Sequence, residues 1–380
     1  MDFNLSKEQR MFKREVINFA KKEIVPRVRE FEKKGEFDFE SFRKLGEFGI
    51  LGLHFPEYLG GGGADVLTTV IAAEALGEAG VDGGLTLSYG AHTFLCADTI
   101  FRHGTKEQVE KYLPKLITGE YIGCMGLSEP NAGSDVASMT TVAEKKGDRY
   151  VLNGTKMWIT NGPIADVAVI YAKTDPSKKH EGISAFIVEK NTPGFSAGPP
   201  IEKMGVKTSQ TSELIFNNCE IPEENLLGKE GEGFLMALET VEWDRSALLA
   251  PFVGATKYVL DRCIDYAKKR IQFDRPIGKF QAIKHKIADI KIFYETARLL
   301  TYKIAWCKDQ GRPINHLEAA VAKLYVGDFS LKPTNDAMVL HGGNGYTHEF
   351  DIERVFRDGR LAPIGGGTSD IQKVIISRML

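Results

Sequence analysis

The chain has 380 residues, 43% of them hydrophobic and 26% charged, which predicts a folded protein with a large core and excludes disordered or collagen-like classes. Its 49 basic and 51 acidic residues leave a formal charge of -2, so no broad cationic surface is expected for nucleic acid or an anionic membrane. No apolar run approaches the roughly 18 residues of a membrane span, and the N-terminus lacks a signal pattern. We therefore expect a cytoplasmic protein.

The five cysteines are widely spaced and form no CxxC pair, so reduced, buried thiols are expected. The histidines form no HExxH pair and no cluster with zinc-like spacing. No metal site is predicted.

Helical patterns fill the first 121 residues. Ser6 followed by Gln9 is typical of a capping box, and segments 67–76 and 85–100 have helical apolar spacing. We predict an N-terminal helical domain over residues 1–121.

Strand patterns follow, over residues 122–228. Tyr150 to Leu152, Asn153-Gly154 and Met157 to Ile159 together predict a β-hairpin. Short apolar runs at 167–171, 183–188 and 214–216, separated by turn residues, predict a small β-barrel or sandwich.

Long helical patterns return in residues 229–380. Segments 248–267, 283–307 and 317–340 carry apolar stripes, with Gly311-Arg312-Pro313 as a breaker. A C-terminal four-helix bundle is expected, and the fold class predicted for the whole chain is α+β.

Four polar or glycine-rich segments are candidates for ligand contact. Gly126 to Asp135 suits an anion-binding loop, and Trp158 to Gly162 ends a predicted strand with an aromatic that could cover a flat ring. Gly342 to Tyr346 and Gly365 to Ser369 let the backbone approach a ligand, and the second leads into a helix. Each is also compatible with an ordinary turn or, for Trp158, with a core position.

The order of these motifs gives a more specific indication than any one of them. GLSEPNAGSD, WITNG, the RIQF segment, HGGNGY, RD and GTSD follow one another through a helix, β, helix pattern. This arrangement resembles the acyl-CoA dehydrogenase family along essentially the whole chain. Residues 87–92 and 111–138 are most similar to its isovaleryl-CoA dehydrogenase branch.

The resemblance implies FAD as cofactor, an acyl-CoA substrate, a homotetramer, and electron-transferring flavoprotein as electron acceptor. It implies that FAD contacts come from Leu127, Ser128, Trp158, Thr160, Thr368 and Ser369. It implies that the FAD of a neighbouring subunit is reached by Arg270, Phe273, Gln281, Leu340, His341, Gly342 and Gly343. It implies that the CoA thioester is contacted by Ser134, Leu235, Glu242, Arg245 and Gly367.

The catalytic base departs from the commonest family pattern. Many members carry a glutamate directly before Gly-Thr-Ser in the C-terminal loop, but here that position is Gly366. In the isovaleryl-type branch the glutamate instead precedes an arginine after the barrel, and here Asp244 precedes Arg245. The resemblance therefore implies Asp244 as base, with the backbone N–H of Gly366 still donating to the thioester oxygen.

Helical spacing gives a separate argument for Asp244. It lies three residues after Val241 and four before Leu248, which would place a carboxylate within an apolar stripe. Burial would raise its pKa toward a value useful for proton abstraction. A buried structural ion pair is the alternative.

A shorter acid at 244 and no side chain at 366 both favour a bulky acyl group. We therefore expect an α-branched or alicyclic substrate, such as cyclohexanecarboxyl-CoA, oxidised to the cyclohex-1-ene thioester. Alternatives are an isovaleryl or short branched-chain dehydrogenase, a 1,4-eliminating enzyme for cyclic enoyl-CoA with Asp98 as a candidate base, a flavin oxidase or monooxygenase, and a non-catalytic scaffold. His92 fits either a pocket wall or a hydrogen-bonded core imidazole.

Overall fold

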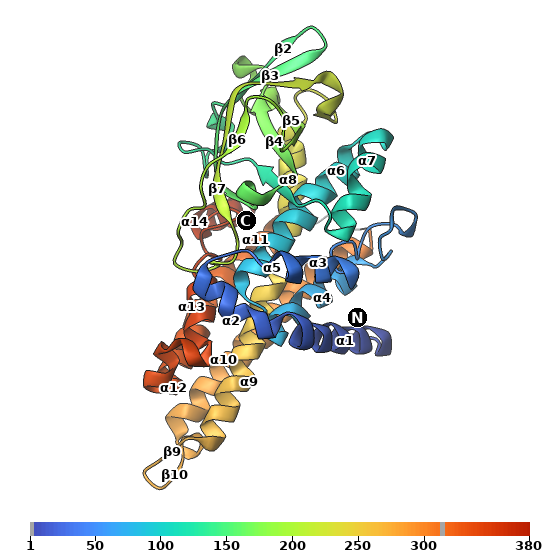
Figure 1. Cartoon of the computed structure of the whole chain (residues 1–380). Coiled ribbons are helices and arrows are strands. Elements are labelled where there is room, and N and C mark those ends of the chain that lie inside the picture. Colours follow the sequence, from blue (N-terminus) through green and yellow to red (C-terminus); the bar gives the residue numbers. More distant parts are fainter. Residues whose placement is uncertain (1–3, 312–315) are drawn as a thin grey trace.

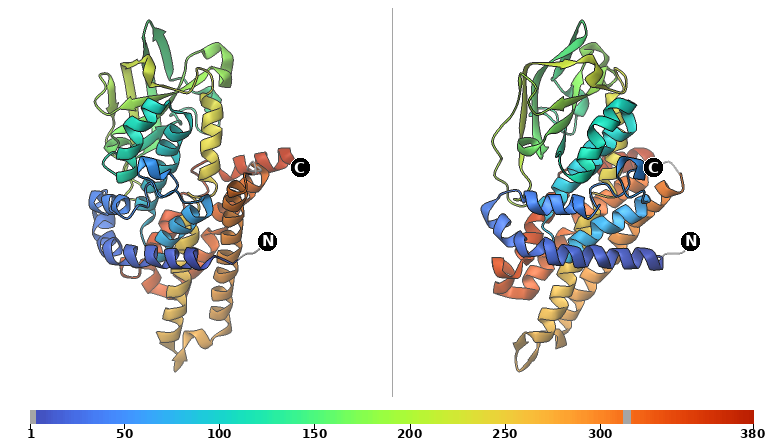
Figure 2. Two further views of the ribbon diagram at one scale, coloured as in Figure 1. Left: turned by 90° about the vertical axis from the view of Figure 1, so that its right-hand side faces the viewer. Right: turned by 45° about the vertical axis from the view of Figure 1, so that its right-hand side comes forward.

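Three regions follow one another along the chain, first helices, then strands, then helices (Figure 1). The computed structural model describes residues 4–311 and 316–380, except for the side chains of residues 241, 242 and 244. The strands gather at one end of the molecule, and the two longest helices run to the opposite end (Figure 2). This is the predicted α+β architecture. The predicted domain limits at 121/122 and 228/229 fall in connecting segments, and where the domains divide stays a prediction.

The first region is helical, as expected. The Ser6 hydroxyl accepts the Gln9 N–H at 3.1 Å and the Gln9 amide oxygen accepts the Ser6 N–H at 3.0 Å, so the predicted capping box is confirmed. Segment 85–100 is helical but contains a π-helical stretch, a feature that often marks functional sites. The helices are α1 (Lys7–Glu23), α2 (Val25–Lys34), α3 (Phe39–Glu47), α4 (Val66–Ala79), α5 (Gly83–Gly90), the π-helix η2 (Ala91–Ala97), α6 (Asp98–His103) and α7 (Lys106–Thr118).

The second region is one mainly antiparallel sheet. Its order is β6-β7-β3-β2-β4-β5-β8, and β1 pairs with β4 in parallel. Alternate residues of the central strands enter two cores: Val169 belongs to a core shared with Leu113 of α7, and Ile170 belongs to a second core with Phe186, its partner on β5. The strands are β1 (Gly123–Gly126), β2 (Val142–Lys146), β3 (Arg149–Thr160), β4 (Val167–Lys173), β5 (Ile183–Glu189), β6 (Phe195–Ala197), β7 (Thr211–Pro222) and β8 (Leu226–Leu227).

The hairpin predicted at Asn153-Gly154 is wrong. Both residues lie inside β3, which pairs with β2 on one side and β7 on the other. A Cβ on Gly154 would come within 2.4 Å of the Thr141 hydroxyl, so this glycine serves a close approach between chains. The turn lies at Gly147-Asp148, where Lys146 pairs with Arg149.

The third region is a helical bundle. Segment 317–340 forms two helices, because the chain breaks at Ser330 and Pro333 then occupies the first turn of α12. The elements are α8 (Gly233–Asp244), α9 (Ala250–Lys269), the short β9 (Ile271–Gln272) and β10 (Arg275–Pro276), α10 (Gln281–Asp309), α11 (His316–Phe329), α12 (Leu331–His341), α13 (Ile352–Gly359) and α14 (Ser369–Met379).

The helical spacing argued for Asp244 does not hold beyond that residue. Helix α8 ends at Asp244, and residues 245–249 form turns before α9 begins. Leu248 is therefore not one helical turn further along the same helix. A new helix, α9, begins at Ala250 with Pro251 in its first turn, where proline is favoured, and proline disfavours a helical conformation in the residue before it.

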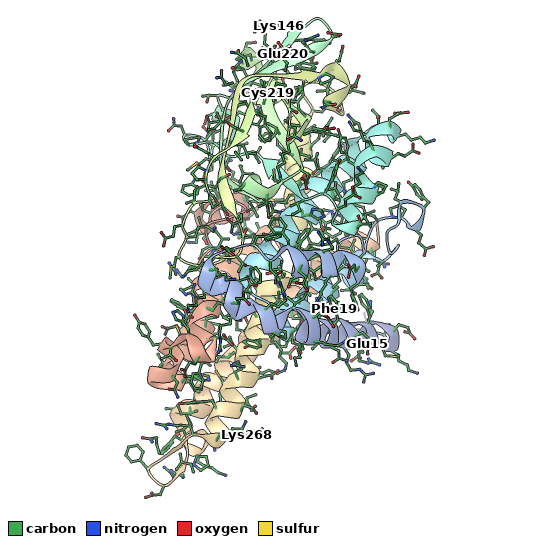
Figure 3. The ribbon with its side chains drawn as sticks, in the orientation of Figure 1. Glu15, Phe19, Lys146, Cys219, Glu220 and Lys268 are labelled. Carbon is green, nitrogen blue, oxygen red and sulfur yellow. The ribbon has the colours of Figure 1, made fainter. Side chains whose placement is uncertain are left out.

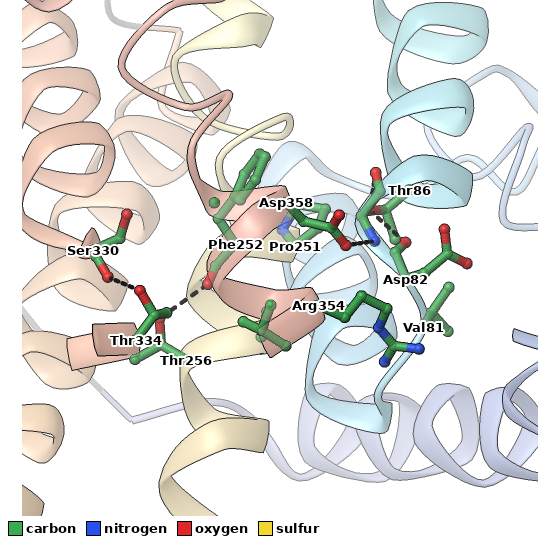
Figure 4. Close-up of a pocket in the computed structure, with 14 residues that line it drawn as sticks. Val81, Asp82, Thr86, Pro251, Phe252, Thr256, Ser330, Thr334, Arg354 and Asp358 are labelled. Carbon is green, nitrogen blue, oxygen red and sulfur yellow. Dashed lines mark hydrogen bonds between the residues drawn. The ribbon is translucent and has the colours of Figure 1, made fainter. Parts of the chain in front are cut away.

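The three regions meet at the carboxylate of Asp358 in α13, which Figure 4 shows beside residues of the first helical region. Its Oδ1 accepts the N–H of Val206 from the β region at 2.6 Å, and its Oδ2 accepts the N–H of Gly83 at the start of α5 at 3.0 Å. A cavity of about 30 Å³ beside it, lined also by Thr86 and Arg354, has room for little more than water. The cavity is a small gap where helices of the first and third regions pack together.

Candidate functional site

The loop after β1 is fixed by a buried ion pair. Lys156 of β3 has no exposed side-chain surface; its ammonium lies 2.7 Å from Glu129 and donates to the Leu127 carbonyl oxygen at 3.2 Å. The N–H groups of Thr140 and Thr141 donate to the same carboxylate. The loop backbone is thereby held against β3.

Both partners of this pair are ionised at neutral pH. Burial opposes the charge of Glu129, but Lys156 and the hydrogen bonds from residues 140 and 141 outweigh it and lower the carboxyl pKa to about 2. Burial lowers the pKa of Lys156 to about 8, and the carboxylate limits the shift. The loop therefore carries a charged anchor directly behind its candidate ligand surface.

Trp158 is held out of the sheet by a bulge. The β3–β7 register shifts between Lys156 and Ile159, and Trp158 adopts φ 65° with 60% of its surface exposed. A left-handed conformation costs a bulky residue roughly 1–3 kcal/mol and tends to occur at functional sites. The Met157 N–H donates to the Ser128 carbonyl at 2.9 Å, so the loop and the bulge lie side by side.

Four of the residues expected at the flavin, Leu127, Ser128, Trp158 and Thr160, thus lie on the loop and the strand that meet at this end of β3. Leu127, Ser128 and Thr160 are half-buried, and the indole of Trp158 is exposed. An aromatic face, two hydroxyls and a backbone held open by a bulge suit a flat, polar-edged ring system. These residues fit FAD.

His92, in the π-helix, is a structural residue. Its ring is fully buried; Nδ1 accepts the Gly123 N–H at 2.9 Å and Nε2 donates to the Leu116 carbonyl at 2.9 Å. Burial lowers its pKa to about 4, so the imidazole is neutral. It supports the first residue of β1, which answers the question that the sequence left open.

Asn161 is a second support that the sequence analysis missed. Its buried side-chain amide donates to the carbonyls of Ser88 at 2.9 Å and Gly123 at 3.1 Å, joining the end of β3 to α5 and β1. Asn161 is the asparagine of the WITNG motif and has a φ of 66°, a left-handed conformation that asparagine tolerates better than most residues. Lys156 could have been recognised as a charged residue at an inward-facing position of a strand.

The C-terminal glycine loop leads into α14. Gly366 and Gly367 adopt φ 64° and 88°, and the Thr368 hydroxyl caps the helix by accepting the Ile371 N–H at 3.3 Å. The Ser369 hydroxyl donates to Asp328. The glycine turn and following helix predicted from the sequence are confirmed.

The expected substrate contacts are described only in part. Ser134 is exposed in the loop after β1, Leu235 is 62% exposed on α8, and Arg245 is buried in the turn after α8. The side chains of Glu242 and Asp244 lie outside the described residues. The backbone places Asp244 at the last position of α8.

The residues expected at a neighbouring subunit's FAD lie far from β3. Arg270 and Phe273 belong to the β9–β10 tip, Phe273 being 87% exposed with φ 51°, and Gln281 begins α10. Tyr266, one turn before Arg270, donates to the His341 carbonyl at 3.3 Å and so joins this tip to the segment 340–343. In Figure 3, Lys268 lies near this tip, and Lys146 marks the far end of the β region, where β3 begins. One chain does not bring the two sets together.

Asp98, the candidate base for 1,4-elimination, is engaged elsewhere. Its buried carboxylate accepts from Arg102 Nε at 2.5 Å and lies 3.2 Å from His54 Nε2. Burial alone would raise its pKa, but His54 and Arg102 outweigh that effect and lower it. The structure gives it a place in an ion-pair cluster.

No group of three potential metal-ligating side chains occurs among the described residues, and none of the described helices is long and apolar enough to cross a membrane.

Three family models match consecutive parts of the chain. The acyl-CoA dehydrogenase N-terminal domain matches residues 6–120, the middle domain 124–219 and the C-terminal domain 231–380. They span nearly the whole sequence in the predicted order.

Curated relatives align over their full length or close to it. The short-chain-specific acyl-CoA dehydrogenase of Clostridium acetobutylicum is 43% identical, with 99% of each chain covered. The mitochondrial isovaleryl-CoA dehydrogenase of Solanum tuberosum is 42% identical, covering 98% of this chain and 90% of the relative.

Solved structures have the same fold. Butyryl-CoA dehydrogenase from Megasphaera elsdenii superposes with a TM-score of 0.96 at 40% identity, covering 100% and 99% of the two chains. A chain from a structure described as the electron transferring flavoprotein of Acidaminococcus fermentans gives 0.96 at 43%, and the FAD complex of PigA gives 0.96 at 35%, both with 100% and 99% coverage.

These matches confirm the predicted fold, the oxidoreductase class and FAD as the cofactor. The chain belongs to the acyl-CoA dehydrogenase family.

Proposed function

We propose that the protein dehydrogenates the α,β bond of an α-branched or alicyclic acyl-CoA, with Asp244 removing the α-proton. The observation that carries this proposal is Gly366: the loop that holds a glutamate in many relatives has no side chain here and adopts a left-handed conformation. The base therefore has to come from another element. Asp244, at the C-terminal end of α8 and directly before the buried Arg245, is our candidate.

The reaction needs a base at the α-carbon, a hydride acceptor at the β-carbon and donors for the thioester oxygen. FAD, when bound, supplies the acceptor at N5. The backbone N–H of Gly366 donates to no protein acceptor among the described residues, so it is available to the thioester oxygen.

The cofactor is proposed to lie between two chains. Leu127, Ser128, Trp158 and Thr160 would hold the flavin, with Thr368 and Ser369 nearby, while Arg270 of a second copy would meet the pyrophosphate, as a guanidinium suits phosphate oxygens. The β9–β10 tip, which carries Arg270 and Phe273, lies at the end of the molecule opposite the β region, and this supports the proposal (Figure 1). A homotetramer built from such pairs is the assembly that the sequence resemblance implies.

Electrons are proposed to leave through an electron-transferring flavoprotein. The match to the chain described with the flavoprotein of Acidaminococcus fermentans supports this choice of partner.

Cyclohexanecarboxyl-CoA is the substrate that we propose, because aspartate withdraws the carboxylate by one methylene relative to glutamate and Gly366 leaves space over the acyl group. An isovaleryl or short-chain substrate is the second candidate, favoured by the 42% and 43% identical relatives with those names.

Turnover of cyclohexanecarboxyl-, isovaleryl- and butyryl-CoA with an artificial electron acceptor separates these candidates. We expect the highest kcat/KM for the cyclic thioester, and preference for butyryl-CoA would refute the cyclic assignment while leaving the reaction class intact.

Asp244→Asn should retain FAD and lose roughly 10³-fold or more in kcat, because a direct base is removed. An undiminished rate would show that the proton goes elsewhere.

A further inference from the structure

Three consecutive glycines form the loop that the proposed mechanism uses. Gly365, Gly366 and Gly367 are exposed or half-buried, and glycine loses more conformational freedom on folding than any other residue. A backbone N–H stabilises a developing oxyanion only if it is already in place, since a misplacement of about 1 Å can cost on the order of 100-fold in rate. Such a loop needs anchors from outside itself.

The segment before the three glycines, residues 361–363, is held by hydrogen bonds to its carbonyl groups. The buried Lys323 of α11 donates to the Ala362 carbonyl, and the N–H groups of Ile364 and Gly365 donate to the Leu361 carbonyl at 2.9 and 3.0 Å. The Ser369 N–H donates to the Pro363 carbonyl at 3.0 Å. These contacts fix both ends of the loop but leave Gly366 and Gly367 between them.

Gln372 reaches that gap. It lies on the first turn of α14, where side chains lean toward the helix N-terminus, and its Nε2 donates to the Gly367 carbonyl at 3.1 Å. Its side chain has no exposed surface, although the α14 residues beside it are exposed or half-buried. A Cβ on Gly367 would lie 2.8 Å from this nitrogen, so the amide packs directly on the glycine backbone.

The cost of this arrangement indicates that its donor matters. Oε1 of Gln372 is buried without a hydrogen-bond partner among the described residues, and an unsatisfied buried acceptor destabilises the folded state. An apolar side chain of equal length would fill the same space without that cost. The Gln372 amide therefore donates one hydrogen bond to the loop, while its oxygen accepts none from the described residues.

We infer that Gln372 is a positioning residue for the dehydrogenation: by holding the Gly367 carbonyl it fixes the peptide between Gly367 and Thr368, and this limits the two glycines before it to a conformation that directs the Gly366 N–H toward the thioester oxygen. This inference rests on the proposed role of that N–H. Gln372 itself touches no reacting atom.

The test compares Gln372→Met with Gln108→Met in the FAD-loaded enzyme. Gln108 is also a buried glutamine that donates to carbonyls, those of Glu224 and Leu226 at 2.7 and 3.0 Å, but it lies on α7, outside the catalytic loop. Both variants lose a buried amide donor, so a general effect on stability should appear in both.

The distinguishing readout is ionisation of bound acetoacetyl-CoA, whose acidic α-carbon forms an enolate that the oxyanion donors stabilise. Gln372→Met should raise the pH at which the bound ligand ionises by about one unit, a tenfold loss, while affinity for a neutral enoyl-CoA stays within about twofold. The kcat of substrate oxidation should fall roughly 10- to 100-fold with little change in KM. Gln108→Met should show none of these effects.

Equal enolate binding in Gln372→Met and the parent enzyme would overturn the inference, as would a proportional loss in both glutamine variants. If Gln372→Met does not fold, Gln372→Glu takes its place, since a carboxylate facing the Gly367 carbonyl should weaken enolate binding further. A parent enzyme that neither ionises acetoacetyl-CoA nor oxidises any acyl-CoA would instead refute the proposed function, so the two failures are distinct.

Discussion

Lys156 has no exposed side-chain surface, and among the described residues its ammonium forms an ion pair with Glu129 alone. Removing one member of a buried pair leaves an uncompensated charge, which costs more than the pair itself contributes. The pair also holds the Leu127 carbonyl, so the flavin loop depends on it.

Lys156→Met should therefore lower the free energy of unfolding by about 3 kcal/mol and weaken FAD binding. Thermal unfolding and FAD titration of the apoprotein measure the two effects. The exposed pair Lys145–Glu223, also in the β region, is the matched control, and Lys145→Met should cost less than about 1 kcal/mol. Adding Glu129→Gln to Lys156→Met should restore part of the lost stability, and equal costs for the two lysine variants would contradict this account.

At the scale of elements, β3 shows why a short motif can mislead. Asn153-Gly154 is the sequence of a tight turn, but here the glycine admits the Thr141 side chain within a continuous strand. Gly147 instead makes the turn with φ 64° and no neighbour where a side chain would lie.

Gly154→Ala should destabilise the protein by about 1–3 kcal/mol, because the added methyl overlaps Thr141. Gly147→Asn should be nearly neutral, because Asn tolerates positive φ and the turn is open to solvent. Chemical denaturation of both variants checks the contrast. The reverse ranking would return the turn to residues 153 and 154.

The sequence predicts interactions between residues that are close along the chain, and it does not predict those that join distant residues. The Ser6 capping box and the glycine turn before α14 depend on neighbours a few residues away, and both were predictable. The Lys156–Glu129 pair joins residues 27 apart and depends on the path of the chain between them. Because the apolar spacing of segment 317–340 continues across Ser330, the sequence pattern did not predict that the helix ends there.

At the scale of the whole molecule, Asp358 joins three regions through one carboxylate. Burial is the main reason that its pKa is raised to about 6; the Val206 N–H and Arg354 oppose the shift, while Asp82 and Glu32 add to it. The folded protein therefore binds a proton more tightly at this site than the unfolded chain does.

Because the Asp358 pKa is higher in the folded protein than in the unfolded chain, stability depends on pH in one direction. Between about pH 4 and 6 the folded state is protonated and the unfolded state is not, so stability falls as pH rises through this window and is level above it. The free energy of unfolding of the parent protein, measured against Asp358→Asn by urea denaturation, should show this slope. A difference that is flat from pH 4 to 7 would contradict the raised pKa.

The proposed sharing of FAD between chains makes a prediction that a single active site within one chain cannot satisfy. Asp244→Asn removes the proposed base, and Arg270→Met removes the proposed pyrophosphate contact, so each variant alone should be nearly inactive, the second with weakened FAD binding. In a mixed assembly, the chain with intact Asp244 can receive intact Arg270 from its neighbour, and that site is complete. Co-expressing the two variants with different affinity tags and isolating doubly tagged protein should restore activity, up to about half that of the parent per chain if the copies pair evenly. If each chain used its own Arg270, no site in the mixture would hold both residues, and doubly tagged protein would stay as inactive as its components.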